Sequence, residues 1–264
     1  MAASRARWLI TASRTGRGGK AEPALFPDQA LRTAQENAED ARAIDHALSL
    51  CYALEAACLV PLWMGDLSAA ERSVAMLLDH SARHALTVWH ARGRCLNGVL
   101  LIKRGEVGGG LPLLRDALDE LRETGFVPHH TALLGTLAQG LAASGDMAQG
   151  LATIDEALSR SERDEELWCI AELLRIKAEL VLLEGGQCAA RAAEEHFQHA
   201  LRWTRRQGIL SMELRCAAGL ARLWHQQGRT EPARDLLAPV YARFTEGFDT
   251  PELRAAKALL VSLG

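Results

Sequence analysis

Apolar residues recur along the chain at the spacing of a helix, and the whole pattern returns about every 40 residues. Two columns of apolar or small residues stand 12 and 5 positions before a recurring glycine. Because the two columns lie seven residues apart, they share nearly one face of a helix, and we expect that face to be buried. The columns are Ala53, Gly93, Leu133, Leu173 and Cys216, and then Val60, Leu100, Gly140, Leu180 and Leu223.

The recurring glycines predict tight turns between a first-type helix, which precedes each glycine, and a second-type helix, which follows it. They are Gly65, Gly105, Gly145, Gly185 and Gly228, at intervals of 40, 40, 40 and 43 residues. A small residue stands five positions later in four units, as two closely packed helices require at their crossing: Ala70, Gly110, Gly150 and Ala233. Counting from Cys188 instead of Gly185 adds Ala193 to this column, so three extra residues fall in the turn "EGGQC".

The ends of the helices carry their own signals. Acidic residues follow three turn glycines, at Asp66, Glu106 and Asp146, where a helix N-terminus favours negative charge. Gly125 and Gly208 have the position of C-caps of second-type helices. Thr250 and Pro251 predict the start of a last first-type helix, and residues from Phe26 onward match a second-type helix, with Pro27 in the place of the turn glycine.

The pattern therefore predicts an all-α solenoid of helical hairpins, about five to six repeats long, over residues 23–264. Residues 1–22 differ: they contain five basic residues and no acid before Glu22. We expect this segment to be a poorly ordered basic tail, although a transit peptide has a similar composition.

Composition limits the partners of such an array. The formal net charge is −3, with 24% charged residues of mixed sign, which gives no reason to expect nucleic acid as a partner. The longest apolar run, around Ala56 to Met64, is too short for a membrane span and is interrupted by Pro61. The six cysteines form no CxxC pair, so we interpret them as small buried residues of a cytoplasmic protein rather than metal ligands or disulfides.

Candidate catalytic or metal-binding groups have simpler explanations. His80 and His84, and His196 and His199, have spacings at which two imidazoles can share a metal, but no accompanying glutamate completes an HExxH motif. We expect His80 and His84 to be surface histidines near a helix end. The glycines of "GEVGGG", residues 105–110, coincide with a repeat turn and its small column, so packing explains them. We find no catalytic residue and expect neither enzyme activity nor a cofactor.

The hairpins resemble the tetratricopeptide repeat, whose ideal unit is 34 residues long rather than 40. The longer unit resembles the C-terminal repeat region of large bacterial signal-transduction ATPases that carry an adenylate-cyclase-like or winged-helix domain. Three segments carry this resemblance: Gln226–Leu260, Trp89–Glu106 and "FPDQALRTAQENA" from Phe26. The ATPase loop GxxxxGK[ST] does not occur, since the only Gly-Lys pair is Gly19-Lys20, followed by Ala21. The resemblance implies a right-handed solenoid that is separated from its ATPase and output domains.

Polar residues on the first-type helices are the candidate binding residues. In tetratricopeptide arrays these helices line the concave surface, so the resemblance implies a protein or peptide partner there. A solvated charged face explains the same pattern. Arg94 stands in an otherwise apolar column, where its side chain either extends to solvent or meets an acidic partner. The candidates are Arg92, Arg94, Glu172, Arg175, Glu179, Arg215 and Arg222.

Three functions fit these observations. The first is a protein- or peptide-binding module of a bacterial signalling or transcriptional regulator. The second is a sensor that binds a small effector in the concave groove. The third is self-association, because an array without its first helix has an uncapped end at residues Ala30 to Ala41.

Overall fold

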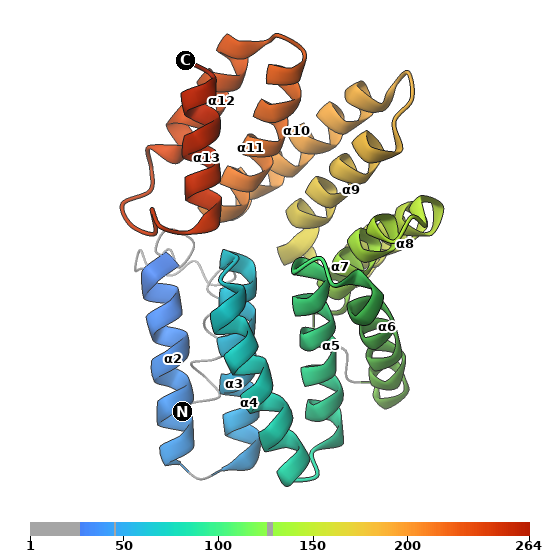
Figure 1. Cartoon of the computed structure of the whole chain (residues 1–264), viewed down its shortest axis with the longest axis vertical. Coiled ribbons are helices and arrows are strands. Elements are labelled where there is room, and N and C mark those ends of the chain that lie inside the picture. Colours follow the sequence, from blue (N-terminus) through green and yellow to red (C-terminus); the bar gives the residue numbers. More distant parts are fainter. Residues whose placement is uncertain (1–26, 45, 126–128) are drawn as a thin grey trace. The chain divides into compact units, whose positions relative to one another are not determined.

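The structure is a computed structural model that describes residues 27–44, 46–125 and 129–264. These residues are almost entirely helical, and they contain no strand (Figure 1). They form two compact units, residues 27–130 and residues 131–264. The predicted tail, residues 1–22, lies outside the described residues.

Unit 1 contains five helices that pack in chain order. The helix α3 contacts α2, α4 and α5, and α5 in turn contacts α6 (Figure 1). The first-type helices are α3 and α5, and the second-type helices are α2, α4 and α6. Their bounds are α2 Pro27–Ala43, α3 Ala47–Met64, α4 Leu67–Arg83, α5 Thr87–Lys103 and α6 Val107–Thr124.

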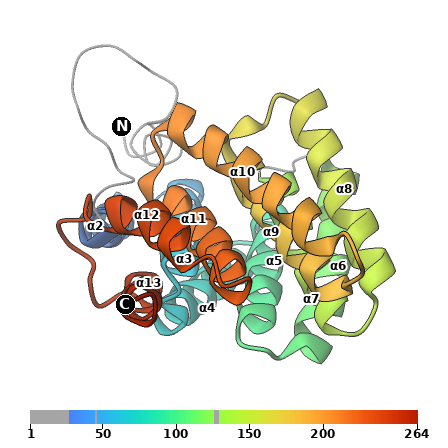
Figure 2. The same cartoon turned by 90° about the horizontal axis from the view of Figure 1, so that it is seen from above.

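Unit 2 continues the same alternation. The first-type helix α11 packs against α10 and α12, and also against the preceding and following first-type helices α9 and α13 (Figure 2). The bounds are α7 His130–Ala143, α8 Met147–Arg163, the 3-10 helix η2 Leu167–Cys169, α9 Ile170–Glu184, α10 Ala189–Gln207, α11 Leu210–Gln226, α12 Thr230–Tyr241 and α13 Pro251–Ser262. The predicted all-α repeat of hairpins is confirmed.

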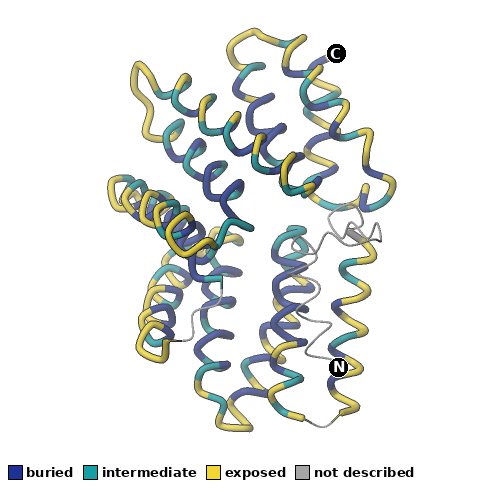
Figure 3. The backbone as a smooth tube through the Cα atoms, turned by 180° about the vertical axis from the view of Figure 1, so that it is seen from behind, coloured by how far each residue is buried: buried dark blue, intermediate teal, exposed yellow. Residues whose placement is uncertain are grey.

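The predicted core columns are buried. Every residue of the two apolar columns is buried, from Ala53 to Cys216 and from Val60 to Leu223. Buried positions run along one side of the helices, whereas the turns are exposed (Figure 3). In unit 2 the core joins residues of five helices, for example Leu174, Phe197, Leu214, Leu237 and Leu253. The seven-residue spacing therefore predicted the buried face correctly.

The turn glycines have the backbone geometry that the repeat requires. All five have positive φ, from 76° at Gly65 to 95° at Gly145, a region that residues with a side chain rarely adopt. Gly125 and Gly208 end α6 and α10 in the left-handed conformation, as predicted for C-caps. The small column is buried at the crossings: a Cβ built on Gly110 would lie 2.9 Å from the carbonyl oxygen of Gly98 in α5.

The helix starts follow the prediction with one exception. The carboxylates of Asp66 and Asp146 accept hydrogen bonds from the amides of Ala69 and Gln149. Thr250 accepts one from Leu253 at the start of α13, where Pro251 is the first residue. Glu106 makes no capping bond through its side chain. Glutamate is not among the preferred N-cap residues, so Glu106 contributes only its charge at the start of α6.

The three extra residues lie in a longer turn, as predicted. The helix α9 ends at Glu184 and α10 begins at Ala189, with Cys188 as the preceding residue. Gly185 and Gly186 both have positive φ in this turn. Cys188 is exposed, whereas the other five cysteines are buried. The prediction that the cysteines are buried was therefore wrong for Cys188, because the insertion places it in a turn rather than on a helix face.

The first described helix, α2, packs its small apolar residues against its neighbour. Its alanines Ala34, Ala38 and Ala41 are buried, and α2 packs against α3. Its exposed residues are mainly polar or charged, including Asp28, Arg32, Gln35, Glu36, Glu39 and Asp40. Among the described residues, these alanines are therefore not an exposed apolar end, whereas self-association through this end of the array stays a prediction.

One described helix, α3, is long and apolar enough to cross a membrane by length and composition alone. Its mean hydropathy is 1.6, and 61% of its residues are buried inside the protein.

Candidate partner-binding surface

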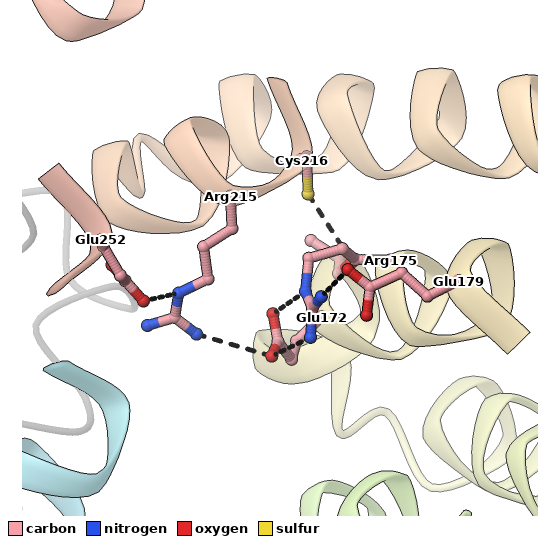
Figure 4. Close-up of polar contacts among 7 residues, drawn as sticks. Glu172, Arg175, Glu179, Arg215, Cys216 and Glu252 are labelled. Atoms are coloured by element: carbon pink, nitrogen blue, oxygen red, sulfur yellow. Dashed lines mark hydrogen bonds and ion pairs between the residues drawn. The ribbon is translucent and has the colours of Figure 1, made fainter. Parts of the chain in front are cut away.

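Five charged side chains from three first-type helices form a continuous row in unit 2 (Figure 4). Arg175 lies between Glu172 and Glu179 of the same helix, α9. Its Nε is 2.9 Å from Glu172 Oε2, and its Nη1 is 2.5 Å from Glu179 Oε1. Arg215 of α11 reaches Glu172 at 3.5 Å with Nη1 and pairs with Glu252 of α13 through Nε. We call Glu179, Arg175, Glu172, Arg215 and Glu252 the charged row.

The local sequence explains how the row forms. Glu172, Arg175 and Glu179 are three and four residues apart, so they share one face of α9. Arg215 stands in α11 at the repeat position equivalent to that of Glu172, and stacking of the repeats brings the two side chains together. The adjacent Cys216 packs on α9, with its Sγ 3.9 Å from the carbonyl oxygen of Ala171.

The row is partly shielded from solvent. The Arg175 side chain is 12% exposed, whereas the two end carboxylates, Glu179 and Glu252, are 34% and 27% exposed. Burial alone would lower the pKa of Arg175, but the charges of Glu172 and Glu179 raise it well above its ordinary value. Burial, with the charge of Glu172, raises the pKa of Glu252 although Arg215 opposes the shift. The arginines thus hold the centre of the row, and its ends are more accessible carboxylates.

Arg222 lies on α11, seven residues after Arg215, and is exposed. Among the described residues it has no hydrogen bond or ion pair. Arg222 therefore adds an exposed positive charge to the negative charges of Glu179 and Glu252 at the ends of the charged row. Such an arrangement of fixed carboxylates and guanidinium groups can bind the polar side chains and backbone of a peptide.

The other two sequence candidates, Arg92 and Arg94, lie in unit 1. Arg92 of α5 is fully buried; its Nε donates to Glu55 Oε1 of α3 at 2.6 Å, and its Nη2 lies 2.9 Å from Nδ1 of His129. Arg94 pairs with Glu120 of α6, with 2.6 Å between Nη1 and Oε2. The two alternatives for Arg94 were a side chain that extends to solvent and one that meets an acidic partner. The structure shows an acidic partner, Glu120, in the same helical hairpin.

The seven candidates are divided between the two units. Glu172, Arg175, Glu179 and Arg215 come together, Arg222 lies on a helix of the same group, and Arg92 and Arg94 form separate pairs within unit 1. Sequence reasoning missed Glu55, which completes the buried pair with Arg92, and Glu252, which completes the charged row. Glu55 could have been noticed as the single acid in an otherwise apolar helix.

The remaining sequence features are structural. His80 is buried rather than on the surface, and its Nε2 is 3.1 Å from the carbonyl oxygen of Ala47, which ties α4 to the start of α3. Its ring lies 4.4 Å from that of His84, measured between centroids. Within the described residues no group of three His, Cys, Asp or Glu side chains is arranged to hold a metal ion. Burial raises the pKa of the Cys95 thiol to about 11 and that of Cys216 to about 12.

Comparisons with known proteins agree with this architecture. No family model matches the chain. No curated protein matches it either. Among the solved structures that match is the crystal structure of yeast Tom70, which is 15% identical with a TM-score of 0.51. The likeness covers 99% of this chain and 46% of that one, so this chain spans about half the length of Tom70. At this identity the match shows the fold alone, a tetratricopeptide-like helical repeat.

Proposed function

We propose that the chain is a non-enzymatic module that binds a protein or peptide along the first-type helices of unit 2. The observation that carries the proposal is the charged row, which spans α9, α11 and α13 and ends in accessible carboxylates. The tetratricopeptide-like fold supports it, because stacked helical hairpins create extended surfaces that suit an elongated ligand.

The fixed positions of the side chains in the charged row favour a role in peptide binding over the alternative of a charged surface that contacts only solvent. A guanidinium group that is fixed between two carboxylates loses little further side-chain entropy when a ligand binds. The charged row consists of residues from three successive first-type helices, so one extended peptide can bind to several repeats at once.

We further propose that this module belongs to a bacterial signal-transduction or transcriptional regulator and acts in the cytoplasm. The segments Gln226–Leu260 and Trp89–Glu106 support the proposal by their similarity to the repeat regions of such regulators. A neighbouring reading frame that encodes an ATPase with a GxxxxGK[ST] loop, and whose product copurifies with this chain, is the expected result. A genomic neighbourhood without such a frame, together with no copurification, contradicts the regulatory context.

A peptide selection tests the binding function. Random 12-residue peptides are selected on the full chain by phage display, and the dissociation constant of the consensus peptide is measured by fluorescence polarisation. The informative variant is Arg222→Glu/Glu179→Gln, which changes the accessible charges and keeps Arg175 and Arg215, whose loss could unfold the chain. The matched control is Arg191→Glu/Glu195→Gln on α10, an exposed pair with the same change of charge.

We expect the first variant to bind the consensus peptide at least about tenfold more weakly, and the control to stay within about twofold. Circular dichroism melts check that both variants fold. Equal affinities in the two variants, or failure of the selection to yield any saturable peptide, contradict binding along the charged row.

A further inference from the structure

The C-terminal end of α10 carries a concentration of exposed arginines. Arg202, Arg205 and Arg206 are exposed, and Arg202 stands three residues before Arg205 and four before Arg206, so it neighbours both on the helix surface. Arg243, just after the end of α12, is also exposed and joins them through a shared partner, Glu213. We call Arg202, Arg205, Arg206 and Arg243 the arginine cluster.

A buried carboxylate holds two members of the arginine cluster in place. Glu213 in the first turn of α11 is 5% exposed. Its Oε1 accepts from Arg205 Nε at 3.1 Å, and its Oε2 accepts from Arg243 Nη1 at 2.6 Å. The two arginine side chains nevertheless remain 57% and 48% exposed. Among the described residues their other N–H groups make no hydrogen bond, so these groups are positioned and available to a ligand.

The arginine cluster has an excess of positive charge. Glu213 forms the ion pairs of Arg205 and Arg243, whereas Arg202 and Arg206 have no ion pair among the described residues. Arg202 and Arg206 are four residues apart on α10, and like charges at this helical spacing destabilise a helix. The last turn of α10 offsets part of this cost, because cations are favourable at a helix C-terminus. Binding of an anionic group relieves the rest.

The chemistry of the arginine cluster suits an anionic group with paired oxygen atoms, such as a carboxylate. All four basic residues are arginines, whose planar guanidinium groups bind carboxylates and phosphates through two parallel hydrogen bonds. The guanidinium carbon of Arg206 also lies over the ring of the half-buried Trp203, 5.9 Å from its centroid, which is the geometry of a cation–π contact. The net charge of the chain, −3, opposes a long polyanion such as nucleic acid. A short acidic segment meets only the local positive field, since salt screens the remainder.

We infer that the arginine cluster is a second binding surface, which docks an Asp- and Glu-rich segment of a partner protein. It lies on α10 and after α12, whereas the charged row lies on α9, α11 and α13. The two surfaces therefore use different residues and can be tested separately.

The probe is a fluorescein-labelled 12-residue peptide with six glutamates alternating with glycine and serine, and its binding to the full chain is followed by anisotropy. Arg202→Gln/Arg206→Gln removes two charges that make no ion pair in the described structure, and keeps the bonds of Glu213. The matched control, Arg254→Gln/Lys257→Gln, removes two exposed charges of α13 that likewise make no ion pair among the described residues. We expect about tenfold weaker binding in the first variant, less than twofold in the control, and weaker binding to the wild type at higher salt.

Three outcomes overturn the inference: no saturable binding of the glutamate peptide to the wild type, equal loss in both variants, or tighter binding of a 12-nucleotide thymidine strand or of a phosphoserine peptide of equal length. Arg222→Glu/Glu179→Gln separates this surface from the proposed function. That variant should keep its affinity for the glutamate peptide, and a parallel loss there contradicts the independence of the two surfaces.

Discussion

Arg92 and Glu55 illustrate how much one buried pair can control. The Arg92 side chain is fully buried and that of Glu55 nearly so, and the two form a direct ion pair. Transfer of an isolated charge from water into such an environment is strongly unfavourable, so the pair is stable only when both members are present. The interaction joins α3 to α5, two successive first-type helices.

Replacement of Arg92 by methionine should therefore destabilise the protein strongly. We expect a loss of about 3–5 kcal/mol in the free energy of unfolding, because the buried Glu55 then loses the guanidinium group that pairs with it and keeps only His129 beside it. Urea unfolding measures the loss. The control is Arg83→Met, which breaks the exposed pair with Asp79 and should cost less than about 1 kcal/mol. Similar losses in both variants contradict the importance of burial.

Glu55 also makes stability depend on pH. Burial would raise its pKa, but Arg92 and His129 outweigh burial and lower the pKa from 4.5 to about 2. A carboxyl group whose pKa is lower in the folded state stabilises the protein fully above pH 4.5, and this contribution is lost as the pH falls toward 2. Over the whole pH range between these two pKa values, the free energy of unfolding should fall by about 3 kcal/mol. Urea midpoints between pH 6 and pH 3 should fall more steeply for the wild type than for Glu55→Gln, and parallel curves contradict this assignment.

At the scale of the element, the crossing of α5 and α6 depends on two facing glycines. A Cβ on Gly98 would lie 2.8 Å from Cβ of Leu114, and a Cβ on Gly110 would lie 2.9 Å from two backbone atoms of α5. Backbone atoms cannot move aside as a flexible side chain can. The two helices must therefore separate if either glycine gains a side chain.

Gly110→Ala should destabilise the protein by about 1–3 kcal/mol through this overpacking. Gly108, two residues earlier in the same helix, has no atom within 4 Å of its would-be Cβ. Gly108→Ala should be neutral or stabilise by up to about 1 kcal/mol, since alanine has the higher helix propensity. Thermal melts of the two variants provide the comparison, and a stabilised Gly110→Ala would show that the crossing tolerates a wider spacing.

The sequence predicted the elements better than the candidate surface, for a physical reason. The turn glycines and the buried columns recur at the same position in every unit, so five copies identify them. Charged pairs do not recur: Arg92 is buried, yet the equivalent residue in the next-but-one unit, Glu172, is partly exposed. The environment of each charged residue depends on a single partner in a neighbouring helix, such as Glu55 or Glu252. That partner does not recur from repeat to repeat, so the periodic pattern does not predict it.

At the scale of the whole chain, each unit is held together by contacts between neighbouring helices. The helix α3 contacts α2, α4 and α5, and α11 contacts α9, α10, α12 and α13. In such an array the stability is close to a sum of terms for single repeats and for pairs of neighbours. Local damage should therefore open nearby repeats before distant ones.

Hydrogen exchange of the Arg92→Met variant tests this locality. We expect the amides of α3 and α5 to lose protection by a larger factor than those of α11 and α12, in conditions where the chain remains folded. Mass spectrometry of peptic fragments resolves the two regions. A uniform loss of protection over all helices would instead indicate that the chain unfolds as one cooperative body.

The long turn between α9 and α10 has a practical consequence for chemical labelling. Cys188 is exposed there, whereas burial protects the other five thiols and raises the pKa of each, that of Cys51 to about 11 and that of Cys169 to about 12. Because a thiolate is the reacting form, a maleimide dye at neutral pH should modify the native chain once, at Cys188. Mass spectrometry should show one added dye in the wild type and none in Cys188→Ser. The insertion thus supplies an attachment point for a fluorophore between α9, which carries part of the charged row, and α10, which carries three of the four residues of the arginine cluster.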